Sequence, residues 1–346
     1  MKDLCTASYQ FSCKAILAFA LLYATPGYAI DRNSDVDRRS TYIIENDELV
    51  LDDGGYTNGL GYTWSYGPFE SFAGRTSAWT EWLTEDLYIA RMESKQRRIS
   101  YQVIQEIYTP EEINVDIPDP NDRPYAGIVT WQASWFAYDE RLADRLLIEL
   151  GIVGSASLAE QVQKGAHTIT GANEPKGWDE QLENEPIFRL GAQRNWRLHN
   201  SVYGHIEYDV ISQVFGAAGT RRSDLGGGIS FRFGKGLGRS LANVSLTPAR
   251  DVNLNAGHAG EWYGFISLGG SYVFNDITLD GNTFENGPSV EIEHWQASAS
   301  IGAAWNLGNW GLLISIRGLS DEFDTQEKDS LYGSLSISYH LAGAQR

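Results

Sequence analysis

Apolar side chains alternate with small or polar ones in many segments of about ten residues along this chain. In 57–66, for example, the apolar face carries Leu60, Tyr62, Trp64 and Tyr66, and the other face carries only threonine, glycine and serine. A period of two is the mark of a strand with one apolar face. Twelve such segments lie near 41–51, 57–66, 98–108, 125–137, 145–154, 187–198, 201–213, 225–235, 262–274, 290–305, 310–318 and 331–341.

The pattern predicts an all-β chain that forms a transmembrane antiparallel β-barrel of about twelve strands. The alternative is a soluble sandwich of half-buried strands. Aromatic side chains gather on one strand face near the strand ends, as in the interfacial belts of membrane proteins, and this favours the barrel. One feature departs from the pattern, because 342–346 lacks the aromatic residue on which outer-membrane barrels commonly end.

The N-terminus has the form of a secretory signal peptide. Lys2 and Lys14 precede an apolar stretch at 15–23, and small residues at Gly27 and Ala29 predict cleavage after Ala29. We therefore expect a signal peptide over 1–29 and one outer-membrane barrel domain over 30–346. The chain has two cysteines, at 5 and 13. Both lie in the leader, so a mature chain would contain no disulfide.

Charge and hydropathy narrow the possible partners. The formal net charge is -18 and the mean hydropathy is -0.32. No segment has the roughly 18 consecutive apolar residues of a spanning helix. The negative charge argues against nucleic acid as a partner, whereas acidic surface attracts divalent cations.

If the N-terminus is periplasmic, the longest outer loop covers 155–186 and contains a helix near 157–171. Ser157 and Glu160 have the spacing of a capping box, and Gly171 is a typical helix stop. One helix face is apolar and can pack on the barrel rim; it carries Leu158, Val162, Ala166 and Ile169. The inner connection over 67–97 is also long, and a short helix is expected at 80–87, with no assigned function.

The predicted helix carries His167 on its polar face. A lone histidine in such a position is usually a surface group, so spacing alone does not make it catalytic. Two other histidines are placed by the strand pattern, with His199 in a tight turn and His205 in the lumen. His205, Glu207 and Asp209 share one strand face and can either bind a metal or form an ordinary polar lumen, which we favour.

Carboxylates and amides gather at the outer end of the first predicted strand, in 45–48, and around the glycine-rich turn of 52–59. Such oxygen ligands suit calcium. The run is not an EF-hand, because its ligands do not alternate and the terminal glutamate is missing. Acidic turns are also found simply solvated.

These features occur together with several longer motifs. They are Asn46-Asp47, the run 56–60 (YTNGL), 105–110 (QEIYTP), 122–126 (DRPYA), and the stretch from 160–163 (EQVQ) through His167, Gly171 and Trp178 to 181–184 (QLEN). In combination the chain resembles the lipid A 3-O-deacylases, outer-membrane barrels of Gram-negative bacteria. The motifs span the first half, and the second half matches only as a strand pattern.

The resemblance implies a twelve-stranded barrel with an outer-loop helix beside the active site. It also implies hydrolysis of the ester-linked acyl chain at the 3-position of lipid A, dependent on Ca2+. The expected substrate is lipid A of lipopolysaccharide, and the expected surroundings are outer-membrane lipids of a Gram-negative bacterium. We expect a monomer whose active site faces the cell exterior.

Transferred by motif, His167 is the general base that activates water. Asn46, Asp47 and Thr57 build the metal and oxyanion region, with Asn46 and Asp47 as metal ligands. The family places a further glutamate six residues beyond the histidine. Asn173 stands at that position here, and we assign the role to Glu174 with a shift of one residue.

The implied chemistry is coherent. Water attack on an ester produces an oxyanion that a divalent cation stabilises. Histidine, with a pKa of about 6.5, accepts a proton from water at neutral pH. The chain has no G-x-S-x-G nucleophile elbow. Two alternatives remain: an outer-membrane phospholipase of the same chemistry, and a non-enzymatic pore or adhesion barrel.

Overall fold

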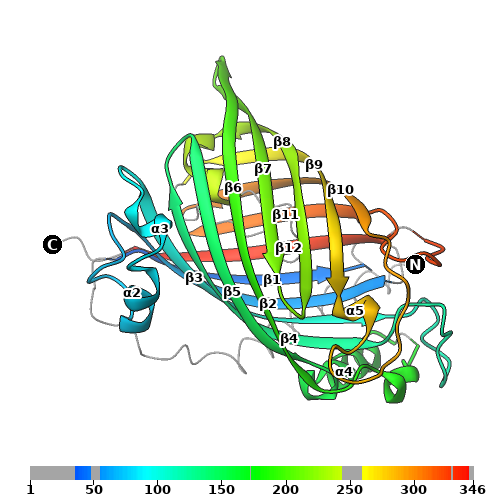
Figure 1. Cartoon of the computed structure of the whole chain (residues 1–346). Coiled ribbons are helices and arrows are strands. Elements are labelled where there is room, and N and C mark those ends of the chain that lie inside the picture. Colours follow the sequence, from blue (N-terminus) through cyan, green and yellow to red (C-terminus); the bar gives the residue numbers. More distant parts are fainter. Residues whose placement is uncertain (1–35, 48–54, 172, 244–258, 329, 343–346) are drawn as a thin grey trace.

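The computed structural model describes residues 36–47, 55–171, 173–243, 259–328 and 330–342, so the predicted leader and the final residues lie outside it. The described chain forms a closed barrel of twelve antiparallel strands in sequence order, which confirms the predicted fold (Figure 1). The strands are β1 (Arg38–Asn46), β2 (Gly55–Phe69), β3 (Gln96–Thr109), β4 (Ala126–Tyr138), β5 (Leu142–Val153), β6 (Glu185–Tyr203), β7 (Ile206–Ala218), β8 (Arg222–Lys235), β9 (Trp262–Asp276), β10 (Trp295–Leu307), β11 (Trp310–Leu319) and β12 (Ser330–Leu341).

The alternation read from the sequence separates a lumen face from an outward face. In β2 the residues Gly59, Gly61, Thr63 and Ser65 are buried, whereas Leu60 and the aromatic residues beside it are partly exposed. The exposed residues of β10 are the apolar ones, such as Ile301, while Ser300 and Asn306 are buried. Polar side chains therefore fill the interior and apolar ones form the outer wall.

The β6–β7 hairpin differs from its prediction. Its turn lies at Gly204 and His205 rather than at 199–200, and His199 belongs to β6 beside a register shift. His205 is exposed and does not line the lumen. The hairpin extends beyond its neighbours (Figure 1), so both of its faces meet solvent there and apolar residues such as Tyr203 stay exposed. Without a buried face, the alternation could not locate the turn.

Ion pairs fill the lumen on the side where β7 and β8 meet. Arg221 binds Glu106 at 2.6 Å and Glu149 at 3.1 Å, and all three side chains are buried. Toward the other end, Asp209 binds both Arg197 and Arg232. Asp209 is thus used in a polar lumen network, and the described residues contain no group of three or more His, Cys, Asp or Glu side chains that could hold a metal.

A short 3-10 helix, η4 (Leu237–Asn243), closes the lumen further. It follows β8 and contacts β4 to β8. The Arg232 guanidinium donates to its backbone at Ser240, and the Asn195 amide donates to the carbonyl of Leu241. The interior is therefore packed rather than open in the part of the chain that the structure describes.

The connection between β2 and β3 forms two short helices, where one was predicted at 80–87. They are α2 (Ala78–Thr84) and α3 (Tyr88–Arg91). Both lie outside the barrel at one end, and α4, on the β5–β6 connection, lies at the other end (Figure 1). None of the helices among the described residues is long and apolar enough to cross a membrane.

The buried arrangement of Arg221 predicts a large loss of stability on its removal. Arg221→Ala leaves two buried carboxylates without their cation, so the free energy of unfolding should fall by about 3–5 kcal/mol. Urea unfolding of the refolded barrel in detergent measures it. The matched control is Arg91→Ala, which breaks the exposed pair with Asp86 and should cost less than about 1 kcal/mol. Equal losses would contradict the structural role of Arg221.

Candidate active site

The helix predicted at 157–171 is α4 (Ala159–Thr170), preceded by a 3-10 turn, η2 (Ser155–Ser157). The predicted stop is confirmed, because Gly171 has φ 78° and its N–H donates to the carbonyl of His167. The predicted capping box is wrong. The N-cap is Leu158, in the left-handed conformation at φ 60°, and Glu160 binds Lys164 one turn later at 2.8 Å.

Helix α4 packs on the outward face of β3 and β4. Glu106, which binds Arg221, points into the lumen, so its neighbours Gln105 and Ile107 point outward. The Gln105 amide donates to the carbonyl of Ser157 at 2.6 Å, and Ile107 packs in one buried cluster with Ala159. The helix therefore lies against the outer side of the wall at its rim, where β3 ends and β4 begins.

A glycine on β4 makes this close approach possible. A Cβ atom at Gly127 would lie 2.2 Å from the Ser157 hydroxyl and 2.3 Å from the Ala159 methyl. No side chain fits at those distances, so any other residue at 127 would displace the start of α4.

The buried face of α4 includes Val162 of the predicted apolar face but differs from the prediction at the start of the helix. Leu158 is 58% exposed, whereas Ala159 and Gln163 are buried. The reason lies in the returning loop, where the indole N–H of Trp178 donates to the side-chain carbonyl of Gln163 at 2.7 Å. Trp178 is buried against Tyr125, with ring centroids 4.9 Å apart. A partner fifteen residues away binds the side-chain carbonyl of the glutamine, and helical periodicity does not record such a partner.

His167 lies one turn beyond Gln163 and therefore at the edge of this packed face, half-buried. Its Nδ1 forms a short hydrogen bond with the backbone carbonyl of Asn173. A carbonyl oxygen only accepts, so Nδ1 carries the hydrogen in this bond. The neutral ring then has Nε2 as its basic nitrogen.

The predicted Asn46, Asp47 and Thr57 come together where β1 ends and β2 begins. The side-chain amide of Asn46 donates to the backbone carbonyl of Thr57 at 2.9 Å, and Asp47 is buried. Thr57 lies at a register shift between β2 and β3, and its hydroxyl is 2.7 Å from that of Thr109. Such bulges change the direction of side chains and are frequent beside active sites.

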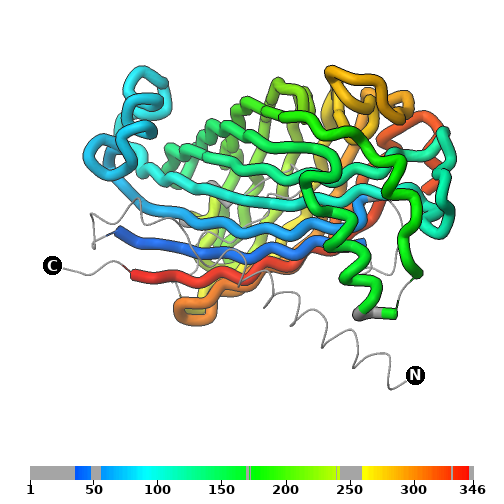
Figure 2. The backbone as a smooth tube through the Cα atoms, turned by 90° about the horizontal axis from the view of Figure 1, so that it is seen from below, coloured from blue at the N-terminus to red at the C-terminus, as the bar shows by residue number. Residues whose placement is uncertain are grey.

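Strand β3 connects the two parts of the site. Thr109 at its end touches Thr57, and Ile107, two residues earlier on the same face, packs against α4. Figures 1 and 2 place α4 at the barrel end where β1 ends and β2 begins. The histidine helix and the polar residues of β1 and β2 thus share one end and one side of the wall.

The assignment of Glu174 as the glutamate expected beyond His167 remains a prediction. Glu174 is exposed, and its charge contributes to raising the pKa of the Lys164 ammonium, which is raised most by the hydrogen bond that Lys164 donates to Glu160. Asn173 is the residue whose backbone touches His167. Asn173 therefore contacts His167 through its backbone carbonyl, a contact that does not depend on the side chain of Asn173.

The donor atoms beside Asp47 suit a hard cation. Asn58 pairs with Asn46 across β1 and β2, and its side-chain oxygen is buried without a hydrogen-bond partner among the described residues. A buried oxygen of this kind is costly unless something binds it. Sequence reasoning quoted Asn58 only within a motif and did not propose it as a ligand. The acidic residues at 48, 52 and 53 lie outside the described residues.

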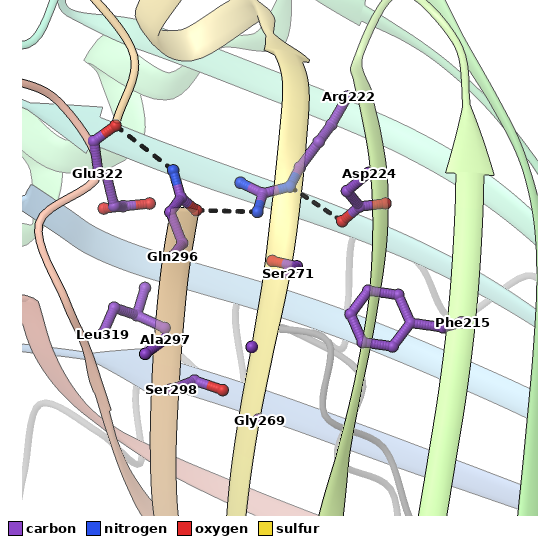
Figure 3. Close-up of a pocket in the computed structure, with 11 residues that line it drawn as sticks. Phe215, Arg222, Asp224, Gly269, Ser271, Gln296, Ala297, Ser298, Leu319 and Glu322 are labelled. Carbon is purple, nitrogen blue, oxygen red and sulfur yellow. Dashed lines mark hydrogen bonds and ion pairs between the residues drawn. The ribbon is translucent and has the colours of Figure 1, made fainter. Parts of the chain in front are cut away.

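A small, partly open cavity of about 40 Å³ lies elsewhere, between β7 and β11 (Figure 3). Arg222 in its lining binds Asp224 at 3.1 Å and Gln296 at 3.0 Å. No predicted site residue lines this cavity, and it lies on strands that α4 does not contact. Its size corresponds to bound water rather than an acyl chain.

A family model described as "Outer membrane protein LpxR" matches residues 15–341. The chain belongs to this family. It is therefore an outer membrane protein, and the outward face of its barrel is the face that meets lipid. Among curated proteins, a sequence search finds no match.

One solved structure has the same fold. LpxR from Salmonella typhimurium superposes with a TM-score of 0.72 at 18% identity, covering 87% of this chain and 99% of that chain. The translocator domain of the autotransporter NalP from Neisseria meningitidis reaches a TM-score of only 0.39 at 12% identity, with 96% and 99% of the chains covered. The first of these likenesses shows that the chain has the LpxR fold.

Because the start of α4 lies so close to Gly127, we expect that Gly127→Val loosens α4 from the wall. Because the new side chain meets Ser157 and Ala159, trypsin should cut after Lys164 several-fold faster than in the original chain. Mass spectrometry of the fragments measures the rate. The control is Gly270→Val on exposed wall, where a Cβ has only an ordinary contact at 3.6 Å. Unchanged protection of Lys164 would show that the helix does not depend on this contact.

Proposed function

We propose that this chain is a calcium-dependent lipid A 3-O-deacylase with His167 as its general base. The observation that carries the proposal is the position of His167. It lies on a helix packed against the lipid-facing wall, at the end where Asn46, Asp47 and Thr57 meet, in a member of the LpxR family. An ester substrate that is itself a membrane lipid would reach this wall without entering the lumen.

His167 is positioned for proton transfer by its neighbours. Its Nδ1–H is bound to the carbonyl of Asn173, so Nε2 accepts the proton from the attacking water. The same carbonyl stabilises the imidazolium that forms. The pair of Gln163 and Trp178 holds α4 at one rotation, which directs the imidazole.

Calcium would be held by oxygen atoms of Asp47, Asn46 and Asn58, with Glu174 as the further ligand expected from the motif. When bound, the cation supplies the positive charge that stabilises the oxyanion of the ester. Thr57, held against Thr109, lies beside these residues. In this proposal its hydroxyl would orient the ester oxygen.

The filled lumen argues against the pore alternative. Arg221 with its two carboxylates and the η4 segment occupy the interior, so an ion path would require both to move. The phospholipase alternative has the same chemistry and differs only in substrate. The site faces the cell exterior if the N-terminus is periplasmic, as the loop lengths predict.

His167→Ala should abolish deacylation. Loss of the base should lower the rate by about 10²- to 10⁴-fold. The measurement is mass spectrometry of lipid A from a deacylase-negative Gram-negative host that expresses the chain. The expected product of the original chain is lipid A without its 3-position acyloxyacyl group.

The matched control is His199→Ala, because His199 is exposed on β6 and far along the chain from the site. It should keep full activity. Unchanged lipid A with good surface expression of the original chain would overturn the proposal. Accumulation of lysophospholipid would favour the phospholipase, and ion conductance without any lipid change would favour the pore.

Chelation of calcium should stop the reaction, and added Ca2+ should restore it. Asp47→Asn keeps the shape of the buried side chain but removes its charge, so restoration should need a higher Ca2+ concentration. Direct binding of Ca2+ by calorimetry supplies a readout besides activity. Full activity in chelator would contradict the metal assignment and leave the role of His167 to be tested separately.

A further inference from the structure

The segment between β2 and β3 has no part in the proposed reaction. It forms α2 and α3 at the barrel end opposite α4 (Figure 1). Both helices pack on the outward face of the barrel, where Ile89 is buried among Ile99, Trp135 and Ala137. These helices therefore cover part of the surface that would otherwise meet lipid.

Trp79 fixes α2 to the wall through aromatic contacts. Its ring lies 6.2 Å from those of Tyr101 and Trp131 and 5.9 Å from that of Trp135, measured between centroids. Thr80 and Thr84 are buried on the inner side of α2. Tyr88 of α3 interacts with Asp144 and Arg194 on the outer wall.

The opposite side of α2 is apolar but uncovered. Trp82 is 76% exposed, and Trp79 remains 43% exposed despite its contacts. Exposed tryptophan on a protein that spans a membrane is typical of the interfacial layer, where the ring is apolar and its N–H meets water.

The same end of the barrel carries an aromatic belt on the side formed by β9 to β12. In an up-and-down barrel the end of each even strand and the start of each odd strand share one end, so this belt and α2 lie at the same end. Trp305 pairs with Trp262 across β10 and β9, and Trp310 contacts Tyr339 at 4.7 Å between centroids. Trp305 and Trp310 are exposed on the lipid-facing side.

We propose that α2 and α3 form an interfacial anchor, with Trp82 inserted into the headgroup layer of the leaflet at this end. The occupant is membrane lipid, because the exposed face continues the lipid-facing wall and lies at the same end as its aromatic belt. The two helices complete the belt over β2 to β5. This proposal depends on the barrel being in a membrane and not on the deacylase activity.

The test measures the depth of a label at position 82. Trp82→Cys is made in a chain with Cys5→Ser and Cys13→Ser, labelled with an environment-sensitive fluorophore and reconstituted into phosphatidylcholine vesicles. The vesicles carry a nitroxide either on the headgroup or in the middle of the acyl chain. We expect strong quenching by the headgroup nitroxide and weaker quenching by the deep one.

Two positions calibrate the experiment. Tyr203→Cys lies at the same end, 83% exposed on the protruding β6–β7 hairpin, and its label should be quenched several-fold less by either lipid. Ile301→Cys lies on the exposed outer wall of β10, and its label should be quenched best by the deep nitroxide. Ala78→Cys on the exposed part of α2 is the second probe if the Trp82 variant fails to fold.

Quenching at position 82 no greater than at position 203 would overturn the proposal, since the face would then lie in water. Energy transfer between labelled copies at high lipid dilution would also overturn it, because a second copy would then cover the face. Heat-modifiable migration of each variant in a gel confirms that the barrel has folded.

Discussion

Closure of the barrel is the constraint on which the other features depend. In a membrane every backbone N–H and C=O needs a partner, and a sheet meets this requirement only when its first strand pairs with its last. Here β1 pairs with β12 along its whole length, from Arg38 opposite Leu341 to Asn46 opposite Gly333. Once closed, every residue of the wall has either a lumen side or a lipid side.

This division explains where function is found. The lumen side is used for stability, with Arg221 between two carboxylates and η4 bound by Arg232. The lipid side carries two additions, α4 at one end and the α2–α3 segment at the other. Because side chains pack the lumen behind the wall, both helices rest on a rigid surface. A preformed site requires such a surface.

The strands were predictable because alternation is a local property that each segment displays by itself. Each of the twelve strands overlaps its expected range, with ends that differ by up to five residues, and the conspicuous error is the β6–β7 turn. The proximity of Asn46, Asp47 and Thr57 also followed from the sequence, since strand ends separated by a short turn must lie together, whereas their roles come from the resemblance alone. The bulge that redirects Thr57 did not, because it depends on the register against β3.

For α4, the spacing of residues along 157–171 predicted the helix and its end at Gly171, both of which are determined by nearby residues. Its start and its rotation came from distant contacts. Gly127 admits Ala159, and Trp178 binds Gln163, so a glutamine is buried while Leu158 is exposed. The periodicity of the helix sequence cannot reveal these contacts, since they are made between residues that lie far apart in the chain. Local patterning therefore defines the barrel and its elements, whereas long-range packing orients His167 on the wall.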